Sequence, residues 1–231
     1  MTSSPMGKRL LRIYTLLDGY FGDLHWWPGN SPFEVIVGAI LTQSTAWRNV
    51  ELAVANLKSH GILSPEGILR TKEDLLAGMI RPSGYYHVKT RRLKSFIRFL
   101  YKEYGGSLDD MFSEPLWTLR EKLLSVWGIG DESADSILLY GGNKPIFVVD
   151  AYTRRILHRH DMIRTGDTYV DVQNLFMRHL PPTVSLYNQF HALLVNGGKY
   201  FCKKTPRCGE CPVNMLDVTT ETVSPCEKCF T

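Results

Sequence analysis

The sequence predicts an all-α protein, because apolar residues recur at helical spacing along most of the chain. The clearest stretch runs from Val88 to Tyr104, where apolar side chains three or four residues apart would form one buried stripe. Only Ile146 to Val149 resembles a strand, and four residues cannot make a sheet. The basic residues expected on the flanks of the Val88 stripe are Lys89, Arg91, Arg92, Lys94 and Arg98.

The other predicted helices follow in order. The segment SPFE at residues 31–34 is a capping-box pattern that opens a helix from about Phe33 to Leu41. The pattern Thr71-x-x-Asp74 predicts a second capping box before another apolar stretch. Further helical stripes are Leu116 to Trp127, Asp171 to Leu180 and Ser185 to Val195.

Length and composition describe a globular protein of one large domain or two smaller lobes. The chain has 231 residues, of which 44% are hydrophobic and 22% charged. Its net charge of +4 is compatible with a polyanionic partner but does not require one. The apolar run from Val35 to Leu41 is far shorter than the roughly 20 residues that a bilayer needs. We read no signal peptide and expect a cytoplasmic protein.

All five cysteines lie between Cys202 and Cys229, with the spacing C-x5-C-x2-C-x14-C-x2-C. An odd number confined to the tail of a chain expected to be intracellular argues against a disulfide framework. Thiolates two residues apart can hold one metal centre without strain in the turn. The pattern favours a metal or cluster loop, and a tail of incidental thiols is the alternative.

Residues 123–139, LLSVWGIGDESADSILL, predict two helices joined by a tight turn at Gly128 and Gly130. The N–H groups that open the second helix could bind a phosphate, although a plain helical hairpin has the same pattern. Further along, Asp150 precedes another helix and would by default be its N-cap. The functional alternative is a carboxylate at the mouth of a cleft that stabilises a developing cation or orients a water.

Three motifs in this order, WGIGDESADSIL, VVDAY and CKKTPRCGEC, resemble the endonuclease III (helix-hairpin-helix) superfamily of DNA glycosylases. The segments VGAILTQSTAW and IRPSGYYHVKTRRL are most similar to its 3-methyladenine DNA glycosylase III branch. The resemblance implies a two-lobed monomer that acts on double-stranded DNA with a damaged base. A six-helix barrel domain with the hairpin would occupy residues 24–144. Residues 1–23 and 145–231 would form a second helical lobe with an iron–sulfur loop.

The resemblance also implies roles for residues at matching positions. Asp150 matches the catalytic aspartate. Gln43 matches the residue that enters the gap left by a flipped nucleotide, and Tyr85 lies where the family places a wedge between bases. From the residues alone, Gln43 could instead cap its helix and Tyr85 could pack in a turn. The hairpin backbone would hold a DNA phosphate around Gly128, Ile129 and Gly130.

One departure from the family decides the expected reaction. Members that also cut the DNA backbone carry a lysine two residues after the second hairpin glycine, where this chain has Glu132 after Asp131. A carboxylate cannot form a Schiff base, so we expect a monofunctional glycosylase that leaves an abasic site. The acidic pair is also expected to weaken the attraction of the hairpin for phosphate. Compensating backbone contacts would come from the flanks of the Val88 helix and from Lys203, Lys204 and Arg207, unless these form only a solvated surface.

An alkylated purine is the expected substrate, because a base methylated at a ring nitrogen is positively charged. Its removal needs a carboxylate for the sugar cation and aromatic faces for the ring, and Trp26 and Trp27 are candidates for that pocket. Tryptophan also packs often in cores. The alternatives are a glycosylase for mismatched or deaminated pyrimidines, an AP lyase that uses another lysine, and a non-catalytic DNA-damage-binding module. No role is assigned to His25, His158, His160 and His191, and His191 is expected in the core.

The cysteine loop also departs from the family norm, which is C-x6-C-x2-C-x5-C. Here the first gap has five residues, and Asp217 stands at the position of the last cysteine. Zinc is the alternative metal, because the spacing of the last four cysteines approaches that of a zinc ribbon. The implied cofactor is a structural [4Fe–4S] cluster held by Cys202, Cys208, Cys211 and either Cys226 or Cys229.

Overall fold

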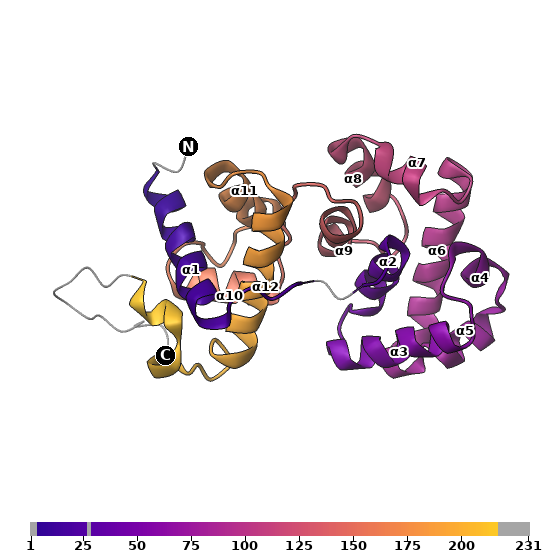
Figure 1. The fold of residues 1–231 in the computed structure, drawn as a ribbon, viewed down its shortest axis with the longest axis horizontal. Coiled ribbons are helices and arrows are strands. Elements are labelled where there is room, and N and C mark those ends of the chain that lie inside the picture. Colours follow the sequence, from indigo (N-terminus) through magenta and orange to yellow (C-terminus); the bar gives the residue numbers. More distant parts are fainter. Residues whose placement is uncertain (1–3, 27–28, 217–231) are drawn as a thin grey trace. The chain divides into compact units, whose positions relative to one another are not determined.

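The computed structural model describes residues 4–26 and 29–216, and in these ranges it contains helices and connecting segments without strands (Figure 1). The prediction of an all-α fold is confirmed. Backbone contacts divide the chain into two compact units, which we call the central unit (27–144) and the terminal unit (1–26 and 145–231). The first boundary thus falls at Trp27, whereas the resemblance implied Leu24. Within the described ranges, no helix is both long and apolar enough to cross a membrane.

The central unit is built around α2 (Pro32–Leu41), whose residues from Phe33 onward are all buried. It contacts α3, α6, α9 and the π-helical turn η2. The remaining elements of this unit are α3 (Trp47–Ser59), α4 (Pro65–Arg70), α5 (Glu73–Met79), η1 (Arg81–Ser83), α6 (Tyr86–Tyr104), α7 (Leu108–Ser113), α8 (Leu116–Leu124), α9 (Asp131–Ser136) and η2 (Ile137–Gly141).

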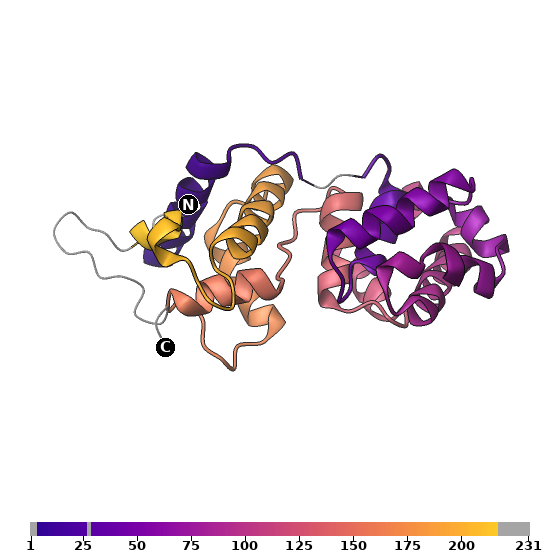
Figure 2. The same ribbon diagram turned by 90° about the horizontal axis from the view of Figure 1, so that it is seen from below.

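In the terminal unit, segments from the two ends of the sequence share one core. The last long helix packs against the first one and against α10, as the views in Figures 1 and 2 show. Its buried face supplies Tyr187 and Phe190, and the first helix supplies Leu10, Ile13 and Leu17. The elements are α1 (Pro5–Phe21), α10 (Ala151–Arg159), α11 (Tyr169–His179), α12 (Val184–Tyr200), η3 (Cys208–Glu210) and η4 (Pro212–Met215).

The first predicted capping box is present in part. Ser31 Oγ accepts a hydrogen bond from the N–H of Glu34 at 3.2 Å, so it caps α2 as predicted. The return bond differs, because the Glu34 carboxylate accepts from the N–H of Asn30 and also pairs with Lys58 at 2.7 Å. Glu34 therefore ties the start of α2 to α3.

The second predicted capping box, at Thr71 and Asp74, is wrong. The Thr71 hydroxyl donates to the carbonyl of Gly67 at 2.7 Å, which stabilises the end of α4. The next helix, α5, has Lys72 at its N-cap position and no side-chain capping bond. Because α5 begins at Glu73, Thr71 lies one position before the N-cap residue and belongs to the end of α4.

The stripe of α6 is confirmed, with Leu93, Phe96, Ile97 and Leu100 buried, but two of the expected flanking lysines are buried as well. Lys89 Nζ donates to the carbonyls of Leu41 at 2.8 Å and Ser83 at 2.5 Å. Burial lowers the pKa of Lys89 to about 8, and nearby Arg92 acts in the same direction. Carbonyls at helix ends lack partners inside their own helix, so Lys89 stabilises the ends of α2 and η1.

Lys94 has a comparable role at the end of α4. Its Nζ donates to the carbonyls of Ile68, Leu69 and Thr71, and burial lowers its pKa. The sequence pattern could not distinguish these lysines from solvated ones, because their aliphatic stems lie beside the apolar stripe. Lys89 and Lys94 therefore stabilise the central unit and do not belong to a basic surface.

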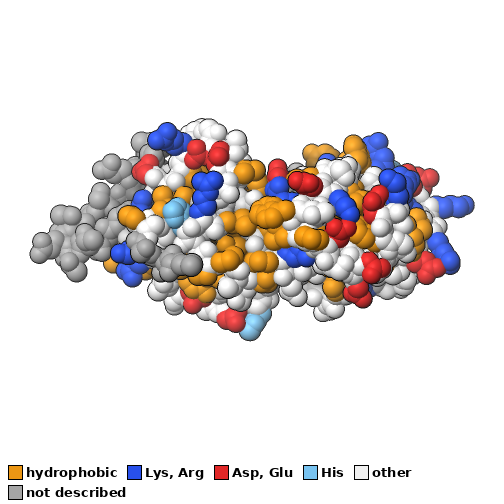
Figure 3. Space-filling model, turned by 90° about the horizontal axis from the view of Figure 1, so that it is seen from above, with side chains coloured by type: hydrophobic (Ala, Val, Ile, Leu, Met, Phe, Trp, Pro, Cys, Tyr) orange, Lys and Arg blue, Asp and Glu red, His pale blue; other side chains and the backbone are white. Residues whose placement is uncertain are grey.

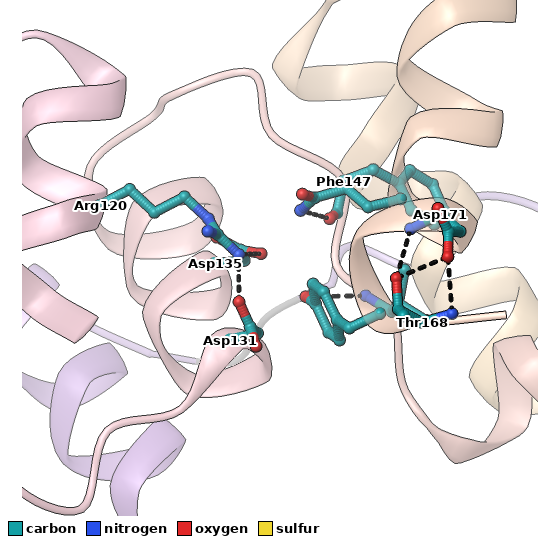
Figure 4. Close-up of polar contacts among 9 residues, drawn as sticks. Arg120, Asp131, Asp135, Phe147, Thr168 and Asp171 are labelled. Carbon is teal, nitrogen blue, oxygen red and sulfur yellow. Dashed lines mark hydrogen bonds and ion pairs between the residues drawn. The ribbon is translucent and has the colours of Figure 1, made fainter.

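Two helices of the terminal unit match their predicted ranges closely. α11 begins two residues before the predicted Asp171, and a capping box joins Thr168 to Asp171 at its start (Figure 4). α12 contains the predicted stretch from Ser185 to Val195 and continues to Tyr200.

Candidate functional site

Asp150 is the N-cap of α10 and holds its carboxylate close to the helix start. Its Oδ1 accepts a hydrogen bond from the N–H of Thr153 at 2.7 Å, and the whole residue is 9% exposed. The N-terminus of a helix favours a negative charge through its free N–H groups and its dipole. Capping and a functional carboxylate are therefore compatible here, because one oxygen caps the helix and the other faces His191 from 3.9 Å.

The segment that leads to Asp150 is fixed by side chains of α11. Residues 146–149 form neither helix nor strand and are almost completely buried. The amide of Gln173 donates to the carbonyl of Phe147 at 2.7 Å, and the ring of Phe147 stacks on Phe176 with centroids 3.7 Å apart. The N–H of Val149 donates to the hydroxyl of Tyr169 at 3.2 Å. Side chains of α11 thus hold in place the segment that leads to Asp150 and α10.

In the central unit, α8 and α9 form the predicted helical hairpin. α8 ends at Leu124, and Gly128 lies in the turn with a positive φ of 88°. A Cβ at Gly128 would stand 2.3 Å from the Cγ of Arg92, so glycine is required on steric as well as conformational grounds. The N–H of Ile129 donates to the carbonyl of Val126 at 3.1 Å. Phosphate binding by this turn would therefore use Gly130 and the first turn of α9 rather than Ile129.

Trp127 differs from its predicted place in the apolar stripe of α8. It follows the end of the helix and is 53% exposed, whereas Leu119 and Leu123 are buried. The guanidinium of Arg91 lies 5.5 Å from the centre of the Trp127 ring, within cation–π distance. The hairpin thus presents an aromatic ring and a basic group beside its turn.

Arg120 changes the electrostatics expected for the hairpin. From α8 it donates to Asp135 through Nε at 2.7 Å and to Asp131 at 2.6 Å (Figure 4). Burial alone would lower the pKa of Arg120, but its hydrogen bonds and attraction to the two aspartates raise it. Arg120 therefore reduces the negative charge that Asp131 places near the turn, but one guanidinium shared by two carboxylates leaves one negative charge uncompensated. Glu132 remains exposed.

Gln43, at the end of α2, is bound to the same hairpin. Its amide nitrogen donates to the carbonyl of Gly128 at 3.0 Å and to the hydroxyl of Ser133 at 2.8 Å, and its amide oxygen accepts from Arg92. Gln43 therefore does not cap its own helix. These bonds position it beside the hairpin turn in the absence of DNA.

Tyr85 lies at the N-cap of α6 in a left-handed conformation, with φ of 44°. Its side chain is 73% exposed, so packing within its turn is not its role. Few non-glycine residues adopt a positive φ, and the strain is compatible with a residue that serves a partner.

Of the two tryptophans predicted to line the base pocket, Trp26 is among the described residues. Trp26 lines a pocket of the terminal unit together with Tyr14, Asp18 and Gln189. The ammonium of Lys199 lies 5.7 Å from the centre of the Trp26 ring, so this aromatic face already accommodates a cation. Trp27 lies outside the described residues.

Three of the predicted cysteine ligands line one pocket. Cys202, Cys208 and Cys211 line one apolar cavity of about 20 Å³ at the end of α12. Cys208 is in a disulfide in this structure, contrary to the expectation that the cysteine tail forms none. Within residues 4–26 and 29–216, no three His, Cys, Asp or Glu side chains are close enough to hold a single metal ion. Cys226, Cys229 and Asp217 lie outside the described residues.

Two arginines of α10 attach the cysteine loop to the helix that Asp150 begins. Arg155 donates to the carbonyls of Cys202 at 2.5 Å and Gly198 at 3.1 Å. Arg159 donates to the thiol of Cys202 at 3.1 Å and to the carbonyl of Lys203 at 2.7 Å. Together the two arginines hold the start of the cysteine loop against α10.

The predicted basic residues of the loop, Lys203, Lys204 and Arg207, are exposed. On the face drawn in Figure 3, Lys and Arg side chains alternate with Asp and Glu rather than gathering in one patch. The protein therefore offers local basic groups at the loop and near the hairpin, and the face in view has no broad basic surface.

A family model described as HhH-GPD superfamily base excision DNA repair protein matches residues 37–182. The match begins in α2 and ends after α11, so it includes the hairpin and Asp150. The chain belongs to the HhH-GPD superfamily. As a member, this HhH-GPD protein is a base excision repair glycosylase whose substrate is DNA.

Relatives of the HhH-GPD protein agree with this assignment. A Methanocaldococcus jannaschii protein whose name describes a DNA repair glycosylase is 42% identical over 208 residues, 89% of this chain and 94% of the relative. Endonuclease III of Thermotoga maritima is 29% identical over 181 residues, 78% of this chain and 79% of the relative.

Solved structures show the same fold. The H. pylori 3-methyladenine DNA glycosylase bound to 1,N6-ethenoadenine has a TM-score of 0.73 and 29% identity, and the match covers 84% of this chain and 97% of that one. A trapped covalent endonuclease III–DNA intermediate has a TM-score of 0.78 over 91% and 94% of the two chains. Its identity of 21% supports the fold alone.

Sequence reasoning missed residues that position the hairpin in the central unit and a residue beside Asp150 in the terminal unit of the HhH-GPD protein. Arg92 and Arg120 looked like ordinary helix-surface charges, and His191 looked like a core residue. No spacing rule marks them, because their partners are 11 to 49 residues away along the chain. For Arg120, the two aspartates on the first turns of α9 were a usable signal, since buried carboxylates require a cation.

Proposed function

We propose that this HhH-GPD protein is a monofunctional glycosylase that removes an alkylated purine, such as 3-methyladenine, from double-stranded DNA. The observation that carries the proposal is Asp150, a mostly buried carboxylate fixed at the start of α10 by the N–H of Thr153. The 29% identical neighbour named as a 3-methyladenine DNA glycosylase supports this substrate class.

The reaction follows from the charge that develops in the substrate. As the bond between the sugar and the methylated base breaks, the base takes both bonding electrons and becomes neutral, while the sugar becomes a cation. The fixed carboxylate of Asp150 stabilises that cation, and a water then adds to the sugar carbon and releases a proton. Because the base already carries a positive charge, its departure needs no strong general acid.

The absence of lyase activity is proposed from the residue at position 132. A Schiff base requires an amine, and Glu132 offers a carboxylate at the start of α9. Lys89, whose lowered pKa of about 8 would otherwise favour a nucleophile, is 1% exposed and donates to two carbonyls. The lyase alternative has no support from these two positions.

DNA contacts are proposed for the residues that the central unit presents around the hairpin. Gly130 and the first turn of α9 would donate to a phosphate, and Arg120, which is shared with Asp135, offsets part of the charge of Asp131 there. Gln43 and exposed Tyr85 would act at the flipped nucleotide, for which flipping costs a few kcal/mol. In the terminal unit, Trp26 would contact the extruded base.

An iron–sulfur cluster is proposed for the cysteine loop, with zinc as the alternative. Cys202, Cys208 and Cys211 line one pocket, and Arg159 contacts the thiol of Cys202. Cys208 would have to leave its disulfide and be reduced to serve as a thiolate ligand. A bound [4Fe–4S] cluster would supply a rigid cross-link in this loop. Cys202, Cys208 and Cys211 would hold it, with Cys226 or Cys229 as the fourth ligand.

The purified protein is expected to absorb near 400 nm and to contain iron, and Cys208→Ser is expected to lose both. Thr205→Ser, in the same loop, is the matched control and should keep them. A colourless protein with one equivalent of zinc would favour the zinc alternative, and a protein that binds neither metal would overturn the proposal.

The substrate proposal is tested by incubating the protein with methylated duplex DNA and with duplexes that contain a thymine or uracil mispair. We expect release of free methylated adenine, an abasic strand that stays unbroken, and no protein–DNA adduct on borohydride treatment. Endonuclease III on its own substrate is the positive control for trapping. Release of the mispaired pyrimidine alone would favour the alternative substrate, and a trapped adduct would show that lyase chemistry occurs.

A further inference from the structure

His191 faces the carboxylate of Asp150 from the neighbouring helix α12. The distance from His191 Nε2 to Asp150 Oδ2 is 3.9 Å, and the two side chains are only 6% and 11% exposed. The other carboxylate oxygen is already bound by the N–H of Thr153. Asp150 is thus fixed on one oxygen by α10 and bordered on the other by the imidazole of α12.

Burial decides the charge of this imidazole. Desolvation lowers the pKa of His191, and this effect exceeds the attraction to Asp150, which raises it. His191 is therefore neutral at neutral pH. A cationic ring would pair with Asp150 and cancel the charge that the sugar cation requires, whereas a neutral ring leaves that charge in place.

Buried aromatic residues belong to the two segments that carry His191 and Asp150. Tyr187 lies one turn before His191 on α12, is fully buried, and meets the ring of Phe147 edge-on with centroids 5.5 Å apart. Phe147 belongs to the segment that leads directly to Asp150. The His191 and Asp150 side chains are themselves mostly buried, and electrostatic interactions are stronger in a buried environment than in water.

We infer that His191 is a positioning residue for Asp150. Its uncharged ring restricts the rotation of the carboxylate, so that Asp150 keeps both its full charge and its direction toward the sugar. The inference rests on the proposed catalytic function of Asp150 and adds a residue that acts through it. Nothing in the sequence pattern separates His191 from an ordinary core histidine.

The test measures how well the protein distinguishes a charged from a neutral abasic site. One duplex carries a pyrrolidine abasic analogue, whose protonated nitrogen mimics the sugar cation, and the other carries a neutral tetrahydrofuran analogue. We expect the wild type to bind the pyrrolidine duplex more tightly. His191→Leu is expected to reduce this preference about tenfold and to change binding of the neutral duplex less than about twofold.

Conservative variants separate positioning from general packing. The amide nitrogen of His191→Gln can take the place of Nε2 and should keep the preference, whereas the shorter His191→Asn should lose it. His158→Leu, on α10 but bound to Thr165 at 3.1 Å, is the matched control and should behave as wild type. If His191→Leu does not fold, as judged by circular dichroism, the inference is tested by comparing the duplex preference of His191→Gln with that of His191→Asn.

Three outcomes would overturn the inference. His191→Leu could keep the preference for the pyrrolidine duplex, or it could weaken binding of both duplexes equally. The third outcome is that His191→Gln and His191→Asn lose the preference to the same extent. Asp150→Asn separates this failure from failure of the proposed function. If Asp150→Asn keeps the preference for the pyrrolidine duplex, the proposed role of Asp150 itself is wrong. If it loses the preference while His191→Leu keeps it, only the role of His191 is wrong.

Discussion

Replacing Asp150 by asparagine is expected to reduce base release by about 10²–10³-fold or more while leaving DNA binding intact. The oxygen of asparagine can still accept the hydrogen bond from Thr153, so α10 keeps its cap and the protein its stability. The negative charge that stabilises the sugar cation is lost. Single-turnover release of methylated adenine measures the rate, and binding of duplex with a tetrahydrofuran site measures the affinity.

Asp171→Asn is the matched control, because Asp171 is also an aspartate at the start of a helix in the terminal unit. Its carboxylate accepts from the N–H of Thr168 at 2.9 Å and the hydroxyl at 2.7 Å. It should keep full activity. Equal activity of Asp150→Asn and wild type would contradict the mechanism. If neither protein releases any base, the non-catalytic DNA-binding module becomes the better interpretation.

Replacing Arg120 by methionine is expected to destabilise the protein by about 3–5 kcal/mol, the largest loss of stability that we predict. The side chain of Asp135 is completely buried, and Arg120 binds it with two hydrogen bonds of 2.7 and 3.1 Å. Without Arg120, a buried charge remains uncompensated. Urea denaturation measures the free energy of unfolding.

The double variant Arg120→Met with Asp135→Leu should regain much of the lost stability, because both buried charges are then absent. Arg98→Met is the control, since the exposed pair of Arg98 and Glu73 at 3.6 Å should contribute less than about 1 kcal/mol. A loss for Arg120→Met no larger than for Arg98→Met would show that the ion pair does not stabilise the hairpin.

Much of the fold was predictable from local patterns. Spacing of apolar residues located α2, α6, α8, α11 and α12, because one face of each helix must be buried. The hairpin turn was also predictable, since Gly128 adopts a positive φ that few other residues tolerate. Local patterns failed where a side chain chooses between two neighbouring partners, as Thr71 does, or where a lysine bends inward to cap a distant helix, as Lys89 does.

The sequence by itself determined the helical class, the family resemblance, Asp150 as the candidate carboxylate and the absence of an amine at position 132. These features depend on residue type and on short spacings. Only the tertiary structure decided that Arg120 bridges Asp131 and Asp135, that Gln43 is bound to the hairpin and that His191 borders Asp150. The physical reason is that charge and hydrogen-bond compensation in a folded chain acts between atoms a few ångströms apart, and these atoms come from residues separated by 11 to 90 positions.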